Sequence, residues 1–212
     1  MPVEVKICGL STPETLEAAL DAGADFVGLM FFEKSPRNVP LGLAERLASI
    51  ARGRARIVTV TVDADDALIA AIARHVRPDL FQCHGAETPE RIAAIKALTN
   101  IDAYKVLKVR DATDVARATA YAGISPFVMF DAMPPEGAVL PGGNGLAFDW
   151  TILKDAGHPF MLAGGLNPGN VAQAIRVTGA DMVDVSSGVE NAPGVKDVAL
   201  IRKFIEAAKR GG

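Results

Sequence analysis

This chain of 212 residues has little cysteine, no excess of basic residues and no long apolar run. Its two cysteines, Cys8 and Cys83, do not make the pattern of a disulfide framework. A formal net charge of -3, with no dense basic stretch, argues against a surface that binds nucleic acid. No apolar run approaches the roughly 18 residues that span a bilayer. We therefore expect no nucleic-acid partner and no membrane partner.

Targeting and linker signals are absent as well. The N-terminus lacks a basic region followed by an apolar stretch and a small-residue cleavage site, so we expect no signal peptide and a cytoplasmic location. No linker or low-complexity tract interrupts the chain, and 50% of its residues are hydrophobic. These properties predict one globular domain with a large core, spanning residues 1–212.

Short apolar runs alternate with helix-like segments along the whole chain. The runs are bounded by turn residues and are often β-branched, which favours strands. We expect strands over Val3–Ile7, Phe26–Met30, Arg56–Thr61, Asp79–Gln82, Ala103–Val109, Phe127–Phe130, Phe160–Ala163 and Met182–Val185. We expect helices over Pro13–Ala22, Leu41–Ile50, Asp65–His75, Pro89–Leu98, Asp114–Tyr121, Trp150–Asp155, Pro168–Thr178 and Val195–Ala208.

Several helices carry recognisable boundary signals. Thr12-Pro13 and Thr88-Pro89 each place a capping hydroxyl before a proline at the first helical position. Gly23, Gly123 and Gly179 each close a helix just before a strand, which is the usual place of a C-terminal glycine cap.

The alternation amounts to eight strand–helix units. Strand–helix–strand crossovers make parallel sheets, and eight such units favour closure into a (β/α)8 TIM barrel. The alternative fold is an open, doubly wound sheet. That fold usually has fewer strands and often a glycine-rich turn after the first strand, whereas Cys8-Gly9-Leu10-Ser11 is no such turn.

Cys8 ends the first predicted strand, where its thiol could project into a pocket as an acid, a base or a nucleophile. By itself this segment favours a buried packing role, because free cysteine is among the most buried residue types. Side-chain alternation puts Lys6 on the same face as Cys8, and a nearby ammonium would favour the thiolate. Cys83 has the opposite parity from Gln82 and His84, so we interpret it as a packing residue.

Active sites of such barrels lie at the carboxyl ends of the strands. Polar residues and glycines gather at those predicted positions, which packing alone does not explain. They are Cys8, Arg37, Gln82, His84, Asp131, Gly164, Gly165, Asp184, Ser186, Ser187 and Gly188.

The loops after the seventh and eighth strands predict a phosphate site. Gly164 and Gly165 let backbone N–H groups approach an anion, and Asn167 would cap a helix that starts at Pro168. Ser186-Ser187-Gly188 would add amides and hydroxyls. Barrels of this kind often hold phosphate in these two loops.

Three further side chains are candidates for chemistry or binding. Asp131 ends an apolar strand, where apolar surroundings could raise its pKa and let it act as an acid. Arg37 can grip a carboxylate through two parallel hydrogen bonds. His84 could be an acid, a base or a hydrogen-bond donor, and without a second histidine nearby we expect no metal site. The glycine- and proline-rich stretch from Pro134 to Gly145 has the length of a functional loop.

Taken together, these motifs resemble the phosphoribosylanthranilate isomerase family over essentially the whole chain. The motifs are Lys6-Ile7-Cys8-Gly9, Ser35-Pro36-Arg37, Gln82-Cys83-His84-Gly85, Asp131 with Gly142-Gly143-Asn144-Gly145 and Asp149-Trp150, Ala163-Gly164-Gly165-Leu166-Asn167-Pro168, and Asp184-Val185-Ser186-Ser187-Gly188-Val189-Glu190. Each is weak alone, but their order along the chain is specific.

The resemblance implies an Amadori rearrangement of N-(5-phosphoribosyl)anthranilate without a metal or organic cofactor. Asp131 would protonate the ribose ring oxygen, and Cys8 would remove the C2 proton. Arg37 would hold the anthranilate carboxylate. His84, Gly164, Gly165, Asp184, Ser186, Ser187 and Gly188 would bind substrate, chiefly its phosphate at the two loops. The protein would be a monomer or a homodimer.

Other phosphosugar barrels are alternatives. The histidine-pathway isomerase and dual-substrate isomerases typically have an aspartate in place of Cys8. Indoleglycerol-phosphate synthase would normally have an N-terminal extension and catalytic lysines. A non-catalytic barrel that binds a phosphorylated ligand would need neither Cys8 nor Asp131.

Overall fold

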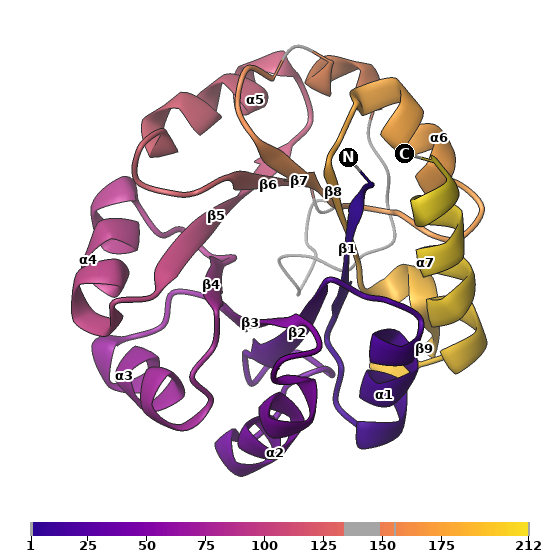
Figure 1. The fold of residues 1–212 in the computed structure, drawn as a ribbon. Coiled ribbons are helices and arrows are strands. Elements are labelled where there is room, and N and C mark those ends of the chain that lie inside the picture. The colour runs from indigo at the N-terminus through magenta and orange to yellow at the C-terminus, as the bar shows by residue number, and fades with distance from the viewer. Residues whose placement is uncertain (1, 134–148, 155, 212) are drawn as a thin grey trace.

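The computed structural model describes residues 2–133, 149–154 and 156–211, and it forms a closed, eight-stranded parallel barrel. The strands are β1 (Glu4–Cys8), β2 (Phe26–Phe31), β3 (Arg56–Thr61), β4 (Leu80–Cys83), β5 (Asp102–Val109), β6 (Val128–Ala132), β7 (Phe160–Leu162) and β8 (Met182–Val185). β1 pairs in parallel with both β2 and β8, which closes the ring (Figure 1). The predicted (β/α)8 barrel is confirmed, and the doubly wound alternative is wrong.

Helices surround this ring and connect successive strands (Figure 1). They are α1 (Pro13–Asp21), α2 (Leu41–Ala51), α3 (Asp66–His75), α4 (Pro89–Thr99), α5 (Ala112–Ala116), α6 (Val171–Thr178) and α7 (Val198–Gly211), with 3-10 turns η1 (Arg117–Tyr121), η2 (Trp150–Leu153) and η3 (Ser187–Val189). The predicted caps are confirmed: the hydroxyls of Thr12 and Thr88 accept hydrogen bonds from the N–H groups of Thr15 and Arg91. In the part of the chain that is described, no helix is long and apolar enough to cross a membrane.

Four predicted helices differ from the structure. The helix expected over Asp114–Tyr121 is α5 followed by the 3-10 turn η1, and in place of the helix expected over Trp150–Asp155 the structure has the 3-10 turn η2. The other two begin three residues later than predicted. α6 begins at Val171 rather than Pro168, because residues 168–170 form a separate turn. α7 begins at Val198 rather than Val195, because Val195 belongs to a two-stranded antiparallel hairpin of β9 (Glu190–Ala192) and β10 (Val195–Lys196). Such short strands give little periodic signal in a sequence.

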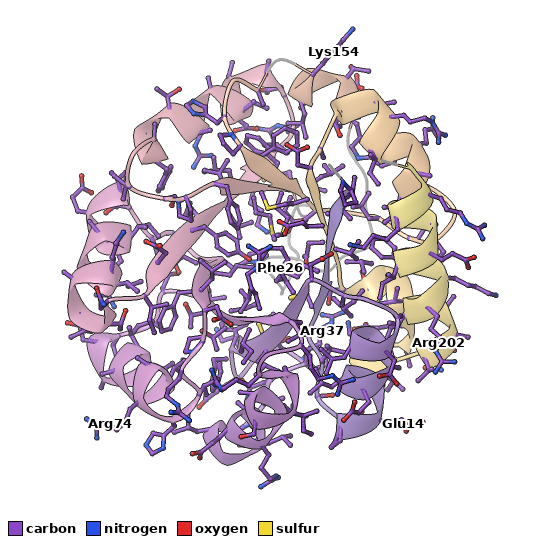
Figure 2. All side chains as sticks on the ribbon, in the orientation of Figure 1. Glu14, Phe26, Arg37, Arg74, Lys154 and Arg202 are labelled. Atoms are coloured by element: carbon purple, nitrogen blue, oxygen red, sulfur yellow. The ribbon has the colours of Figure 1, made fainter. Side chains whose placement is uncertain are left out.

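Side chains on the strands alternate between two apolar cores. One core fills the barrel and includes Phe26, which Figure 2 places at its centre, together with Tyr104 and Met129. The larger core lies between the strands and the helices and includes the fully buried Cys83. This confirms that Cys83 is a packing residue. Its neighbours Gln82 and His84 have the opposite parity and share the inner face of β4.

Candidate active site

The barrel brings the predicted polar residues together where the strands end. Cys8 is the last residue of β1, Asp131 and Asp184 lie near the carboxyl ends of β6 and β8, and His84 directly follows β4. Cys8, Asp131 and Asp184 are all buried. Parallel strands end at the same edge of a sheet, so four positions far apart in the sequence converge on one site.

Cys8 shares its surroundings with a buried ion pair. Lys6 is completely buried, and its Nζ lies 2.7 Å from Oδ1 of Asp184. Burial raises the pKa of the Cys8 thiol; Lys6 pulls this pKa down, and Asp184 raises it further. The sum of these effects raises the pKa of Cys8. The expectation that Lys6 makes Cys8 a thiolate is therefore corrected: Asp184 neutralises the ammonium, and the resting group is a thiol.

Asp131 is held as a carboxylate by two donors. Lys108 Nζ, from β5, lies 2.7 Å from Oδ2 of Asp131, and His84 Nε2 lies 3.3 Å from the same oxygen. Burial alone would raise the pKa of Asp131, but Lys108 and His84 outweigh it and bring the pKa well below its ordinary value. The expectation of a raised pKa is thus wrong, because the surroundings of Asp131 are cationic rather than apolar.

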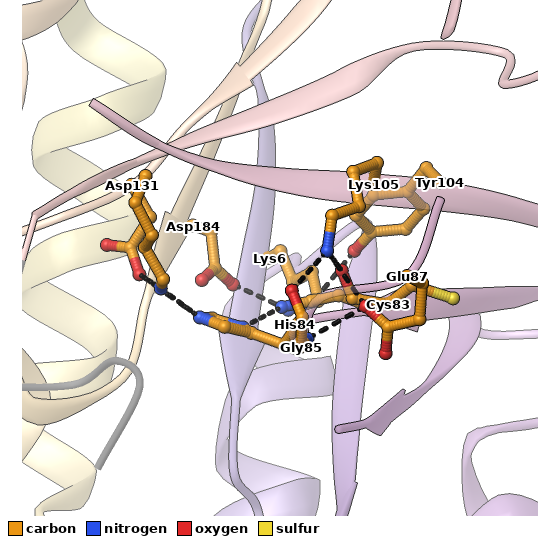
Figure 3. A network of polar contacts seen from close by, with 11 residues as sticks. Lys6, Cys83, His84, Gly85, Glu87, Tyr104, Lys105, Asp131 and Asp184 are labelled. Carbon is orange, nitrogen blue, oxygen red and sulfur yellow. Dashed lines mark hydrogen bonds and ion pairs between the residues drawn. The ribbon is translucent and has the colours of Figure 1, made fainter. Parts of the chain in front are cut away.

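A chain of side-chain hydrogen bonds orients His84 (Figure 3). The hydroxyl of Tyr104 donates to Oε1 of Gln82 at 2.8 Å, and Nε2 of Gln82 lies 3.0 Å from Nδ1 of His84. With its amide oxygen bound to Tyr104, Gln82 donates to Nδ1, so the ring proton is assigned to Nε2, facing Asp131. Burial and Lys108 lower the pKa of His84, which keeps the ring neutral.

A second ion pair clamps the backbone on both sides of His84. Lys105 Nζ lies 2.8 Å from Oε2 of Glu87, and both side chains are buried on the outer face of the barrel. Lys105 donates to the carbonyl oxygens of Cys83 and Gly85, while Glu87 accepts from the N–H of Gly85 at 2.8 Å (Figure 3). The loop that presents His84 is therefore fixed by groups on the opposite side of the sheet.

The loops after β7 and β8 meet closely at the predicted phosphate site. Gly164 and Gly165 have φ angles of 88° and 65°, in the left-handed region that favours glycine. A Cβ on Gly188 would lie 1.9 Å from the carbonyl oxygen of Leu166, so only glycine fits between the two loops. The N–H groups of Gly164, Gly165 and Gly188 donate to no residue that the structure describes. These loops can therefore offer backbone donors to an anion.

Two details of this cradle differ from the expectation. Asn167 accepts a hydrogen bond from the N–H of Gly169 at 2.8 Å, as a cap would, but it caps the turn before α6 rather than α6 itself. The hydroxyl of Ser186 is already engaged, since it donates to the carbonyl oxygen of Cys8 at 3.2 Å and lies 3.2 Å from Lys196 Nζ. Ser186 therefore ties β8 to β1 rather than presenting a free hydroxyl.

Arg37 forms a paired contact with the β9–β10 hairpin. Its Nε and Nη2 donate to the two carboxylate oxygens of Glu190 at 2.7 and 2.8 Å, and Lys196 Nζ lies 2.6 Å from Oε1 of the same carboxylate. All three side chains are buried. Glu190 thus holds Arg37 in place and leaves the donors of Nη1 for another group.

The comparisons with known proteins agree with this arrangement. The family profile described as "N-(5'phosphoribosyl)anthranilate (PRA) isomerase" matches residues 5–207. The chain belongs to this family. It is 56% identical over 211 residues to the N-(5'-phosphoribosyl)anthranilate isomerase of Rhodopseudomonas palustris strain BisA53, covering 99% of this chain and 97% of that one. The N-(5'-phosphoribosyl)anthranilate isomerase of Rhizobium meliloti is 52% identical over 212 residues, and the match covers 99% of each chain.

Solved structures of phosphoribosylanthranilate isomerases share the fold. The Thermotoga maritima enzyme superposes with a TM-score of 0.88 at 35% identity, covering 98% of this chain and 99% of that one. Another isomerase structure contains reduced 1-(o-carboxyphenylamino)-1-deoxyribulose 5-phosphate. It has a TM-score of 0.85 at 34% identity, and the match covers 98% of this chain and 99% of that one.

Several residues of this candidate site were given no role in the sequence interpretation. They are Lys108, the Lys105–Glu87 pair, and Glu190 with Lys196. Alternation along β5 could have flagged Lys108, which has the same parity as the inward-facing Tyr104. The ion pairs join separate strands and loops, so no local pattern marks them.

Part of the predicted site has no structural description. The stretch from Pro134 to Gly145, with its Gly142-Gly143-Asn144-Gly145 motif, lies outside the described residues. Within the described ranges, no group of three or more His, Cys, Asp or Glu side chains is placed to hold a metal ion.

Proposed function

We propose that this chain is the isomerase of tryptophan biosynthesis that converts N-(5-phospho-β-D-ribosyl)anthranilate into 1-(2-carboxyphenylamino)-1-deoxy-D-ribulose 5-phosphate. One observation carries the proposal. A thiol and a carboxyl group, Cys8 and Asp131, converge at the carboxyl end of a barrel whose β7 and β8 loops present backbone N–H groups that donate to none of the described residues. Membership of the isomerase family supports the substrate.

The reaction proceeds by general acid–base catalysis. Asp131 protonates the ribose ring oxygen, the C1–O bond breaks, and the nitrogen lone pair forms an iminium ion. The positive nitrogen acidifies the C2–H bond. Cys8, which is a thiol at rest, first gives its proton to solvent and then removes the C2 proton as a thiolate. The resulting enolamine tautomerises to the ketone, and no covalent enzyme intermediate forms.

The remaining polar groups bind substrate. The backbone at Gly164, Gly165, Ser187 and Gly188 holds the phosphate, with Ser186 supporting the loop. Arg37 holds the anthranilate carboxylate through the donors that Glu190 leaves available. His84 and Asp184 face the sugar and keep Asp131 and Lys6 in position. The monomeric and homodimeric states both suit this site, and one solved structure describes monomers of a dimeric phosphoribosylanthranilate isomerase.

Two substitutions test the acid–base assignment. Cys8→Ser and Asp131→Asn should each lower kcat by about 10²–10⁴-fold, the usual contribution of a positioned acid or base, with little change in KM. The assay is the loss of anthranilate fluorescence with freshly generated substrate. Cys83→Ala is the matched control, because this thiol lies in the outer core, and it should retain kcat within about twofold.

The alternative function is a barrel that binds a phosphorylated ligand without turning it over. It predicts phosphate-ligand affinity in the wild type but no loss of fluorescence. Near-normal turnover in Cys8→Ser or Asp131→Asn would instead refute the assigned roles while leaving the isomerase activity intact.

A further inference from the structure

Lys108 is a titratable residue inside the barrel mouth for which the proposed mechanism has no role. It lies on β5 in direct register with Asp131 on β6, so the two residues are neighbours across the sheet. Its side chain has the same parity as the inward-facing Tyr104 and Val106. Its side chain is only 17% exposed, which is low for a lysine.

Two donors converge on one oxygen of Asp131. Lys108 Nζ lies 2.7 Å from Oδ2, and His84 Nε2 lies 3.3 Å from the same atom. Lys108 and His84 are also within hydrogen-bonding distance of each other. The ammonium of Lys108 donates to Asp131 and also contacts the His84 ring, so Lys108 lies against both groups.

The resting site therefore places the proton beside the acid rather than on it. Lys108 and His84 keep Asp131 ionised. His84 is neutral, which leaves the ammonium of Lys108 as the charged proton donor in contact with the carboxylate. The charged groups that act on Lys108 are Asp131 from β6 and Lys105 from its own strand, with neutral His84 facing it from β4. Burial lowers the pKa of Lys108 despite Asp131, which makes the ammonium a better acid than an exposed one.

We propose that Lys108 supplies the proton that Asp131 delivers to the ribose ring oxygen, an inference that rests on the proposed isomerase function. The ammonium gives one proton to Oδ2, leaving a neutral amine and a carboxylic acid. Bound substrate excludes water from the site and thereby favours this transfer, because burial disfavours both the ammonium of Lys108 and the carboxylate of Asp131. The carboxylic acid then protonates the ring oxygen, the C1–O electron pair moves to that oxygen, and the positive charge ends on the iminium nitrogen.

Every proton is accounted for at the end of one turnover. Cys8 gives its thiol proton to solvent before the reaction and regains a proton from C2, and the amine of Lys108 takes up one proton from solvent. Formation of the ketone from the enolamine moves a proton from oxygen to C1 and changes no net charge. Lys108 acts through Asp131, so it is a positioning and proton-supplying residue.

Lys108→Met tests the supply of the proton. The variant must protonate Asp131 from water, so we expect kcat to fall by about 10²-fold near pH 8 with KM little changed. The ratio of wild-type to variant kcat should shrink by up to tenfold for each pH unit below neutrality, because acid restores the proton on Asp131. The base Cys8 is common to both proteins and cancels in this ratio.

Lys108→Arg separates proton supply from charge. A guanidinium can keep Asp131 ionised, but it does not release a proton in this pH range. We expect Lys108→Arg to stay at least 10²-fold below the wild type across pH 6–9. Wild-type activity in Lys108→Arg, or a loss in Lys108→Met that does not vary with pH, would overturn the proposal.

A measurement without substrate separates this proposal from the isomerase function. The carboxyl of Asp131, followed by 13C NMR, should titrate at higher pH in Lys108→Met than in the wild type, and an unchanged titration would overturn the relay. Lys96→Met, which removes an exposed lysine paired with Asp102, should change neither kcat nor its pH dependence. A wild type that shows no turnover would refute the isomerase function, whereas active Lys108 variants refute only the relay.

Discussion

Cys8 lies against the backbone of Gly28 on the neighbouring strand β2. A Cβ on Gly28 would stand 2.9 Å from Sγ of Cys8 and 3.0 Å from its Cα. The sequence placed Cys8 at the end of a strand correctly. It did not predict that the thiol is protonated at rest, because its pKa depends first on burial in the folded barrel and also on Asp184, which lies 176 positions further along the chain.

Gly28→Ala tests how tightly the thiol is placed. The added methyl group must displace Cys8, so we expect kcat to fall about tenfold or more while the barrel stays folded. Gly42→Ala is the control, since a Cβ there meets no atom within 4 Å and alanine favours the helix. Steady-state kinetics of both variants decide the matter, and equal kcat values would contradict this account of Cys8.

The β9–β10 hairpin is the element that the sequence interpretation missed. It contributes Glu190 and Lys196, which surround the guanidinium of Arg37. Sequence periodicity predicted a helix from Val195, because strands of two and three residues are too short to show an alternating pattern. By contrast, the proline and threonine signals at α1 and α4 are local, and they were sufficient to predict where those helices start.

Glu190→Gln tests the hairpin through the pH dependence of stability. Arg37 and Lys196 hold the pKa of Glu190 below its ordinary 4.5 despite burial, so its ionised form stabilises the fold above that pH. This contribution is lost as the pH falls through the lower folded pKa. We expect the variant to be less stable than the wild type by about 1–3 kcal/mol at pH 7, with the gap narrowing below pH 4.5.

Urea denaturation at several pH values measures this gap. Glu206→Gln removes an exposed partner of Arg210 and should change the free energy of unfolding by no more than about 0.5 kcal/mol. A gap of the same size at pH 7 and pH 3.5 would rule out the stabilising role of ionised Glu190.

At the scale of the whole molecule, function and stability draw on different faces of the same strands. The inner face carries the acid–base residues above an apolar barrel core, while the outer face packs against the helices. Phe204 on α7 is completely buried in that outer core. The outer face also holds the Lys105–Glu87 pair that fixes the His84 loop, but its apolar core is the larger one and lies on the opposite side of the strands from the acid–base residues.

Phe204→Ala tests this separation. Deleting a buried phenylalanine side chain typically costs about 3–5 kcal/mol, so the free energy of unfolding should fall by that amount. The kcat of the folded variant at 25 °C should remain within about twofold of the wild type. Leu98→Ala, at a side chain that is 48% exposed, should be nearly neutral, and a large loss of kcat in Phe204→Ala would contradict the separation.

The sequence by itself determined the eight-fold alternation, the helix caps and the family, and it predicted which polar residues gather at the carboxyl ends of the strands. These are local or order-dependent patterns that can be recognised in the sequence alone. Only the tertiary structure decided the protonation of the site: Cys8 is a thiol, Asp131 a carboxylate and Lys108 its neighbour. A pKa depends on burial and on charges within a few ångströms, and those charges come from strands that are distant in the chain.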